Sequence, residues 1–220
     1  MNVTVIGCGG IGGYLAIPLS RYLTVSASGK GHINYIDADK FEEKNLSRQM
    51  CSDSALGKNK ARWLSKFTKA LTPKGVTTSH SEEYVKPTNI ESLLRGSDVV
   101  MVCVDNNATR KLVDEWADTS EAVVITGGNE VYDGNVYMRT KDTQPMRTIH
   151  KTINTPKDHN PGVSCTEAVE DTPQIAGTNM MIAAFMLTQL MRHHLGERGC
   201  DEVYVDVRKC ASLAYDRPLK

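Results

Sequence analysis

The sequence predicts an α/β fold: a Rossmann-like, doubly wound and mostly parallel sheet with antiparallel strands toward its C-terminal end. Two stretches carry this prediction. Residues 3–6 form a short β-type run that passes at once into Gly-x-Gly-x-x-Gly and a helix-like segment, an arrangement typical of nucleotide-binding folds. Residues 98–104 form a long apolar run with the composition of a central parallel strand. We expect the 220 residues to form one domain, 1–220.

The composition is that of an ordinary globular protein, with 40% hydrophobic and 24% charged residues. The formal net charge is zero, which argues against a broad electrostatic grip on nucleic acid or an anionic membrane, although a local basic site stays open. No apolar run reaches the length of a membrane span, and the first residues lack the pattern of a signal peptide. We therefore expect a cytoplasmic protein with neither nucleic acid nor a membrane as partner.

The cysteines are scattered along the chain and contain no Cys-x-x-Cys pair. This spacing argues against a tetrahedral zinc site, and a disulfide framework is unnecessary in a chain of this length. Cys8 and Cys103 lie in or beside apolar strand runs, so we expect both to be small buried residues. The six positions are 8, 51, 103, 165, 200 and 210.

The glycine loop at residues 7–12 connects the first strand to the first helix. Its glycines (Gly7, Gly9, Gly10 and Gly12) would let the backbone approach a phosphate chain, and the helix N-terminus supplies free N–H groups. A bare tight turn is the alternative. The loop does not distinguish ATP from NAD. Asp37 follows Gly12 at about the distance of a ribose-binding acid in dinucleotide folds, so an NAD-dependent oxidoreductase stays open.

Residues 37–49 follow the second expected strand, 33–36. Ligands of open α/β sheets bind outside the carboxyl ends of the strands. A carboxylate at this position can hold ribose hydroxyls, and an arginine eleven residues later can reach phosphate. An isolated Asp-x-Asp would more simply be a solvated acidic turn. The polar residues that we place near the ligand are Asp37, Asp39, Asn45, Arg48 and Gln49.

Two further segments supply charged residues. We expect a helix to begin at residues 57–61, and the helix dipole disfavours positive charges such as Lys58 and Lys60 at this end. Beside a triphosphate the same two charges would be stabilising. The alternative is that both are solvated surface lysines. The strand at 98–104 ends in Asp105, which we assign to Mg²⁺ because a hard cation prefers a carboxylate. A helix N-cap is the competing role for Asp105, and Asn106 could take it instead.

The remaining elements are shorter or more polar. Before the long apolar strand we expect an irregular strand and loop at 77–86 and a short helix at 89–95. After it we expect a buried strand at 122–125 and an antiparallel continuation at 131–139 that turns at 133–134. An unstructured polar loop at 141–160 then leads to a mostly buried, methionine-rich helix at 178–195, and a last strand at 202–207 closes the chain.

Together these motifs resemble the ThiF/MoeB/ubiquitin-activating family of ATP-dependent adenylyltransferases, over residues 3 to about 138. Asp-x-Asp-x5-Asn-Leu-x-Arg-Gln is the most specific of the motifs. The matching segments are Gly-x-Gly-Gly-x-Gly (7–12), the motif just named (37–49), Gly-Lys-x-Lys (57–60), Asp-Asn-x-x-x-Arg (105–110) and Thr-Gly-Gly…Asp-Gly-Asn-Val (126–136).

The resemblance implies roles for these residues. Gly9 and Gly10 would line the phosphates, Asp37 would hold the ribose and Asp105 the metal-bound triphosphate, while Asn45, Arg48 and Lys60 would contact the phosphates. The chain would be a single adenylation domain with a crossover loop at about 141–165. Within or beside that loop, Cys165 resembles a family cysteine that accepts the acyl group in some members; an inert loop cysteine is an equal alternative, because Glu167 disfavours the thiolate.

The implied reaction is adenylation, by ATP with Mg²⁺, of the C-terminal carboxylate of a small ubiquitin-like or sulfur-carrier protein ending in Gly-Gly, followed by thioester or persulfide transfer. We also expect a homodimer. The carboxylate is already ionised, so positioning and charge neutralisation suffice. A hydride-transfer enzyme would need a proton-exchanging group, and His150 and His159 stay open for that role.

The chain departs from the family pattern in three ways: it begins at the first strand, without the usual preceding helix and its arginine; it lacks the paired Cys-x-x-Cys zinc ligands; and it is short. Because this arginine is missing, the interpretation of the chain as a non-catalytic binding module stays open. A small acid, a peptide terminus or a tRNA-linked carboxylate stays open as an alternative substrate.

Overall fold

The computed structural model of the chain describes residues 1–26, 30–72, 74–154, 175–197, 200–217 and 219. Through these residues runs one eight-stranded sheet, with strand order β3-β2-β1-β4-β5-β6-β7-β8. Neighbouring strands from β3 to β5 are parallel, and those from β5 to β8 are antiparallel, as predicted. The strands are β1 (Asn2–Ile6), β2 (Gly31–Ile36), β3 (Val76–Ser81), β4 (Val99–Val102), β5 (Val123–Asn129), β6 (Asp133–Arg139), β7 (Glu202–Asp206) and β8 (Ala211–Tyr215).

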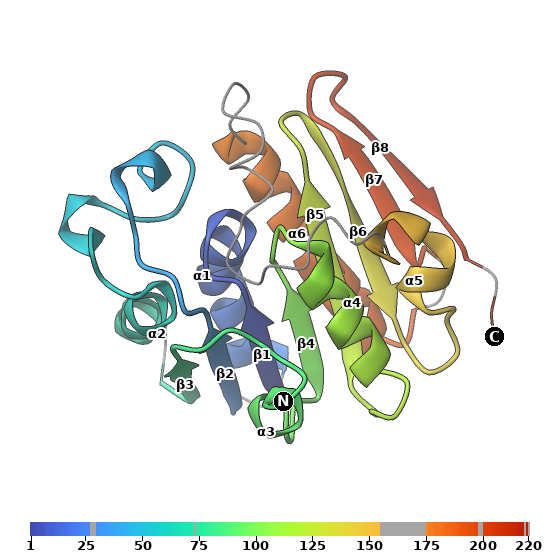
Figure 1. Ribbon diagram of the computed structural model, residues 1–220, viewed down its shortest axis with the longest axis horizontal. Coiled ribbons are helices and arrows are strands. Elements are labelled where there is room, and N and C mark those ends of the chain that lie inside the picture. The colour runs from blue at the N-terminus through green and yellow to red at the C-terminus, as the bar shows by residue number, and fades with distance from the viewer. Residues whose placement is uncertain (27–29, 73, 155–174, 198–199, 218, 220) are drawn as a thin grey trace.

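Helices cover both faces of the sheet, which confirms the doubly wound prediction (Figure 1). One layer contains α1 (Gly10–Ser26), α2 (Lys60–Leu71) and α6 (Ala176–His194), and the other contains α3 (Ile90–Leu93), α4 (Asn107–Trp116) and α5 (Met146–Ile149). Each layer packs on its own buried cluster, with Leu15, Leu19 and Leu190 on one side and Val100 and Val113 on the other. The apolar residues of β1 and β4 alternate between these two clusters, as strands buried on both faces do.

The chain changes direction across the sheet at β1, which pairs with β2 on one side and β4 on the other. Ile6 is the register partner of both Ile36 and Val102, so the three strands end level. A crevice outside the strand ends at such a switch point is the usual ligand site of open α/β sheets. The loops after β1, β2 and β4 therefore meet at one edge.

Two adjacent glycines bring the helical layers close to the sheet at the end of β5. A Cβ atom on Gly127 would lie 2.4 Å from the Met186 sulfur on α6. A Cβ atom on Gly128 would lie 2.7 Å from Nη2 of Arg110 on α4. Because successive strand residues face opposite sides, the two glycines make room for one helical layer each.

Several element boundaries differ from the sequence-based expectation. Gly57 has a φ of +74°, which does not continue into a helix, so α2 begins at Lys60 with Asn59 as its N-cap. The segment 77–86 is more regular than expected, since β3 pairs with β2 over six residues. β6 already begins at Asp133, so the turn lies before the predicted 133–134.

The expectation of an unstructured loop at 141–160 is wrong for its first part, which contains α5 and a short 3-10 helix, η3 (Lys151–Asn154). Polar contacts fix this segment: Arg147 pairs with Asp114 of α4 at 2.7 Å, and the Tyr137 hydroxyl donates to the Gln144 carbonyl at 2.7 Å. Residues 155–165 of the expected crossover loop lie outside the described residues.

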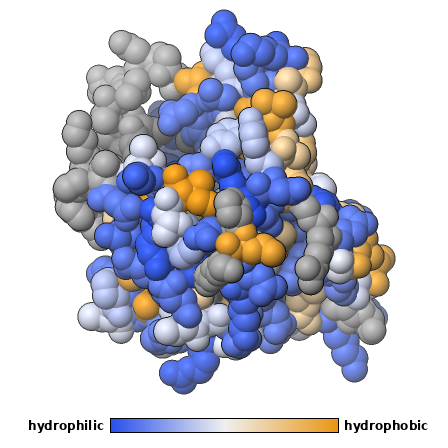
Figure 2. All heavy atoms as spheres, turned by 90° about the vertical axis from the view of Figure 1, so that its right-hand side faces the viewer, coloured by the Kyte–Doolittle hydropathy of each residue, from blue (hydrophilic) through white to orange (hydrophobic). Residues whose placement is uncertain are grey.

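The chain also does not close at 202–207, because β8 follows β7 and pairs with it. All five β8 residues are exposed, and Figure 2, which faces this side, shows hydrophobic groups scattered among hydrophilic ones. On α6 the prediction of a mostly buried helix fails for three of its four methionines: Met186 is buried, whereas Met180, Met181 and Met191 are exposed. No helix in the described part of the chain combines the length and hydrophobicity needed to cross a membrane.

Candidate active site

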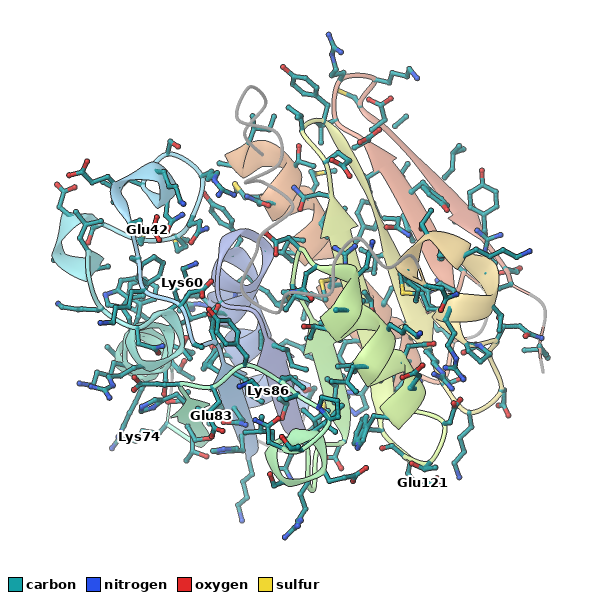
Figure 3. All side chains as sticks on the ribbon, viewed as in Figure 1. Glu42, Lys60, Lys74, Glu83, Lys86 and Glu121 are labelled. Carbon is teal, nitrogen blue, oxygen red and sulfur yellow. The ribbon has the colours of Figure 1, made fainter. Side chains whose placement is uncertain are left out.

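A cleft opens at the edge where β1, β2 and β4 end. Most predicted site residues line it: Gly7, Gly9, Gly10, Asp37, Asp39, Asn45, Arg48, Gln49, Lys60 and Asp105. Gly12 does not line the cleft, and Cys165 lies outside the described residues. In Figure 3, Lys60 lies at the carboxyl end of the central strands, between α1 and α2.

The four glycines of the first loop divide into two pairs by what surrounds them. Gly7 has a φ of +89°, and a Cβ atom there would meet the backbone of Cys103 at 2.9 Å. A Cβ atom on Gly12 would lie 2.0 Å from the Gly7 carbonyl oxygen. These two glycines are needed for the loop to pack on the sheet. Gly9 and Gly10 line the cleft at the start of α1, where free N–H groups and the helix dipole favour an anion.

Asp37 at the end of β2 fixes the glycine loop as well as facing the cleft. Its Oδ2 accepts from the Cys8 N–H at 2.7 Å, and its Oδ1 accepts from the Asp39 N–H at 2.9 Å. Burial raises the pKa of this carboxyl to about 6, although Lys60 opposes the shift. The carboxylate is therefore held rigidly, with lone pairs remaining for donors such as ribose hydroxyls.

Asp39 lies between a cation and a phenol. Lys60 Nζ is 3.4 Å from Asp39 Oδ2, and the Tyr84 hydroxyl donates to Asp39 Oδ1 at 2.5 Å. The side chain of Lys60 is only 11% exposed, so the ammonium group is directed by its surroundings rather than by solvent. The hydrogen bond to Asp39 raises the pKa of Tyr84 to about 12. Tyr84 is thus held as a neutral phenol at the wall of the cleft.

The loop after β2 turns on Asn45. Its Oδ1 accepts from the Glu42 N–H at 3.0 Å, and its carbonyl accepts from the N–H groups of Arg48 and Gln49 at 3.1 and 2.9 Å. Asn45 is 3% exposed and closes the loop in the same way that a capping residue closes a helix. The turn places Arg48 and Gln49 side by side on the cleft wall.

Gln49 carries a signal that the cleft accepts a ligand. Its side chain is nearly buried at 7% exposure and lies beside Gly9, with Nε2 3.3 Å from the position of a Gly9 Cβ. Its Oε1 has no hydrogen-bond partner among the described residues. A buried amide oxygen without a partner is costly, and a ligand with donor groups in the cleft would satisfy it.

At the end of β4 the capping role falls to Asn106, whose Oδ1 accepts from the Thr109 N–H at 2.8 Å. Asp105 is half-buried, lines the cleft and is not the N-cap of α4. Nearby, Arg110 donates from Nε and Nη2 to the Val104 carbonyl at 3.1 and 2.8 Å. Within the described residues, no cluster of three or more potential metal ligands is present, so a cation here would rely on Asp105 together with phosphate oxygens.

The cysteines and histidines of the described residues do not offer catalytic groups in this cleft. Cys8 and Cys103 are buried, which confirms the expectation for both, and burial raises the pKa of their thiols, which disfavours the reactive thiolate. His150 Nε2 lies 2.6 Å from Oε1 of Glu202, and His150 does not line the cleft. Cys165 and His159 lie outside the described residues, so the expectations for them stay untested.

Several residues that line the cleft or support it were not predicted. Tyr84 and Val85 belong to no motif, because they follow an edge strand whose residues carry no periodic signal. Arg110 stands in the quoted Asp-Asn-x-x-x-Arg motif, which was the available signal, but it had received no role. Asn129 and the buried Asn179 come from β5 and α6, and no spacing rule connects them to the glycine loop.

The arrangement can bind a polyanion. Arg48 and Lys60 supply positive charge, the start of α1 supplies N–H groups, and Asp37 and Asp105 supply carboxylates at the two sides. A nucleoside triphosphate with a divalent cation has the matching distribution of hydroxyls, phosphates and metal.

Comparison with known proteins identifies relatives of this sequence. A SAMP-activating enzyme E1 from Haloferax volcanii is 36% identical over 150 residues, which cover 67% of this chain and 53% of that enzyme. The adenylyltransferase and sulfurtransferase MOCS3 from Mus musculus is 30% identical over 144 residues, which cover 65% of this chain and 30% of that protein. The chain thus spans only part of the length of these relatives.

Solved structures share the fold at low sequence identity. E. coli MccB with ATP superposes with a TM-score of 0.74 at 17% identity, covering 99% of this chain and 64% of MccB. PaaA superposes with a TM-score of 0.75 at 19% identity, covering 100% of this chain and 64% of PaaA. The family description that matches the sequence is the ThiF family, over residues 1–216. With that match across nearly its whole length, the chain belongs to the ThiF family.

Proposed function

We propose that this chain is an ATP-dependent adenylyltransferase that activates the C-terminal carboxylate of a small ubiquitin-like or sulfur-carrier protein. The observation that carries the proposal is the convergence of Arg48, Lys60 and Asp105 with the glycine loop in one cleft. Relatives described as a SAMP-activating E1 and as adenylyltransferases support it. The carrier would end in Gly-Gly, and residues 1–220 would act as one adenylation domain.

In this reaction the carboxylate oxygen attacks the α-phosphorus of ATP, a P–O bond forms, and pyrophosphate leaves with the electron pair of the broken bond. The nucleophile is already ionised, so no residue must remove a proton. Arg48 and Lys60 neutralise the charge that grows on the phosphates, and Asp37 holds the ribose. Asp105 would hold Mg²⁺, which supplies further charge neutralisation when bound.

Exchange of labelled pyrophosphate into ATP, measured across a panel of Gly-Gly-ended carriers, tests the proposal. The Lys60→Ala variant is expected to lose at least about a hundredfold in exchange, because a nearly buried cation at the phosphates is removed. Lys58→Ala is the matched control, since Lys58 is exposed two residues away and does not line the cleft. Asp105→Ala should abolish exchange.

Three results would replace the proposal. NADH binding tighter than ATP binding, without exchange, would indicate an oxidoreductase. Stable carrier binding without exchange would indicate a non-catalytic binding module. Exchange with a small acid or a peptide but with no carrier would keep the adenylation and reject the carrier.

We further propose that the acyl group then passes to sulfur, with Cys165 as the acceptor within this chain. The adenylate carbonyl would be attacked by the thiolate, a thioester would form and AMP would leave. A hydroxylamine-sensitive, thiol-sensitive adduct with the carrier is expected for the wild type and not for Cys165→Ala. Equal adduct in both would move the acceptor to another protein's cysteine.

We also propose that the chain forms a homodimer, with the exposed methionines of α6 supporting this. Met180, Met181 and Met191 are 53%, 42% and 39% exposed, and flexible thioether side chains suit adaptable interfaces. Sedimentation equilibrium should give twice the chain mass for the wild type and the chain mass for Met181→Glu. A monomeric wild type at micromolar concentration would reject the dimer.

A further inference from the structure

Asn179 is a fully buried polar residue on α6, the helix that lies beside α1 in the layer behind the sheet in Figure 1. Its Nδ2 donates to the carbonyl of Arg48 at 3.1 Å, and its Oδ1 accepts from Nδ2 of Asn129 at 3.1 Å. Arg48 lies on the loop after β2, and Asn129 lies at the end of β5. One side chain therefore joins three segments that are distant in the sequence.

The same amide also covers the start of α1. A Cβ atom on Gly10 would lie 2.5 Å from Nδ2, 2.6 Å from Cγ and 2.7 Å from Oδ1 of Asn179. No real Cβ atom tolerates such distances, so the Asn179 side chain occupies the space that any larger residue at position 10 would need. Gly10 and Asn179 are therefore matched to each other.

Main-chain hydrogen bonds position the loop that carries Arg48. Its main chain is held at Asn45, by turn hydrogen bonds, and at the Asn179 contact to the Arg48 carbonyl. The hydrogen bond from Asn179 to this carbonyl fixes the position of the Arg48 main chain, and with it the point from which the Arg48 side chain extends into the cleft. Because a displacement of about 1 Å at a charged contact can cost on the order of a hundredfold in rate, this support matters for phosphate binding.

We propose that Asn179 is a positioning residue, which sets the main chain at Arg48 and at Gly10 so that the guanidinium and the loop N–H groups meet the same phosphates. The proposal rests on the proposed ATP-dependent function. A purely structural role is the alternative: in that case Asn179 would stabilise the fold without affecting the affinity for phosphates.

Gln189 provides the matched control on the same helix. It is 1% exposed, and its Nε2 donates to the Cys200 carbonyl at 2.7 Å, away from the cleft. Asn179→Leu and Gln189→Leu each remove a buried amide bonded to a main-chain carbonyl, so both should lower the melting temperature. Should Asn179→Leu not fold, Asn179→Ala is compared with Gln189→Ala.

The readout is the dissociation constant of MgATP and of adenosine, measured by calorimetry. We expect Asn179→Leu to weaken MgATP binding about tenfold and leave adenosine binding unchanged, because the lost support concerns the phosphates. Gln189→Leu should change neither constant. Equal MgATP constants for the two variants, or equal loss of ATP and adenosine binding, would overturn the proposal.

The Gly10 contact gives an independent measurement. Gly10→Ala should weaken MgATP binding strongly in the wild-type background and clearly less in the Asn179→Ala background, where the new methyl group has space. An equal loss in both backgrounds would show that the phosphate, and not Asn179, excludes a side chain at position 10, and would overturn the match between the two residues.

These measurements separate the two proposals. A wild-type chain that does not bind MgATP overturns both. Binding with the expected Asn179 effect, but without pyrophosphate exchange for any acid, overturns the adenylation and supports the positioning role. Exchange in the wild type together with an Asn179→Leu variant that behaves like Gln189→Leu overturns the positioning role alone.

Discussion

At the scale of single residues, the two carboxylates of the Asp-x-Asp pair differ in their surroundings. Asp37 accepts two main-chain N–H groups and is held by the loops that it joins. Asp39 instead contacts two side chains, Lys60 and Tyr84. The position of Asp37 thus depends on main-chain donors and that of Asp39 on neighbouring side chains, which predicts different responses to substitution of those neighbours.

Protonation of Asp37 should be visible in the stability of the protein. Burial raises the pKa of this carboxyl from 3.8 in the unfolded chain to about 6 in the fold, so between these pH values the folded state holds a proton that the unfolded state has released. The contribution of Asp37 to stability therefore falls as the pH rises through this window and stays low above it. Melting temperatures from pH 4 to pH 7.5 should show the wild type losing stability relative to Asp37→Asn. Parallel curves would contradict this.

Tyr84 should affect ATP affinity through Asp39. Tyr84→Phe removes the hydroxyl that bonds to Asp39 Oδ1 and keeps the ring, so Asp39 is free to move relative to Lys60. We expect the KM for ATP to rise about fivefold, a cost of about 1 kcal/mol that is typical of one hydrogen bond, with kcat little changed. Steady-state exchange kinetics give both constants. Tyr132→Phe, at an exposed tyrosine outside the cleft, is the control.

The sequence predicted that Asp37, Asp39, Arg48, Lys60 and Asp105 lie in one cleft, because they belong to compact motifs after strand ends or at a helix start. It could not predict Tyr84, Asn129 or Asn179. Each of these reaches the site through tertiary packing, and a lone tyrosine or asparagine has no spacing pattern that points to a distant partner. Asp105 and Asn106 illustrate the boundary: the sequence left the capping role open between them, and the structure assigns it to Asn106.

At the scale of elements, the start of α2 shows how a cap becomes part of a site. Asn59 Oδ1 accepts from the Arg62 N–H at 2.9 Å, as an N-cap does. Its Nδ2 donates to the carbonyls of Asp37 and Asp39 at 2.8 and 3.2 Å. One buried amide therefore fixes the helix that carries Lys60 to the loop that carries both acids.

Two substitutions of Asn59 should separate these functions. Asn59→Asp keeps the cap oxygen but replaces the donor to the two carbonyls, whereas Asn59→Ala removes both. We expect Asn59→Ala to lower the free energy of unfolding by about 2 kcal/mol, half of it from the cap. In pyrophosphate exchange the two variants should be similarly impaired, since both lose the donor. An Asn59→Asp variant with wild-type exchange would show that only the cap matters. Urea unfolding and exchange assays provide the measurements.

Element prediction from sequence worked where hydrophobic patterning was strong. β1, β4, α1 and α6 stand out because their apolar residues are continuous or periodic. α5 and β8 were missed for physical reasons: α5 is a single turn held by the Arg147–Asp114 ion pair, and β8 exposes all five residues, so neither carries an apolar periodicity.

At the scale of the whole molecule, a buried charge joins segments of the antiparallel half that are distant in the sequence. Glu202 on β7 is fully buried and receives hydrogen bonds from Asn135 and Arg217 at 2.8 and 2.7 Å, and its Oε1 lies 2.6 Å from Nε2 of His150. These partners come from the segment after α5, from β6 and from the end of the chain. Removing any of them leaves a buried charge without full compensation.

This cluster should shape the acid sensitivity of the protein. Burial alone would raise the pKa of Glu202, but its bonds from His150, Asn135 and Arg217 lower it to about 2. Because the folded pKa is below the unfolded value of 4.5, the stabilisation is complete above pH 4.5 and is lost as the pH falls toward 2. The difference in melting temperature between wild type and Glu202→Gln should therefore shrink on acidification from pH 6 to pH 3. A constant difference would exclude this role.

The pair Gly127–Gly128 has a consequence for how freely this sequence can vary. Met186 and Arg110 press on the end of β5 from opposite sides, so a methyl group added at either glycine must push one of them away. In a saturation library the exposed β8 positions should accept most replacements, whereas Gly127, whose Cβ atom would meet the buried Met186 and Ile182, should accept few. Both natural sequence drift and directed evolution should therefore change the exposed strand β8 long before they change the end of β5.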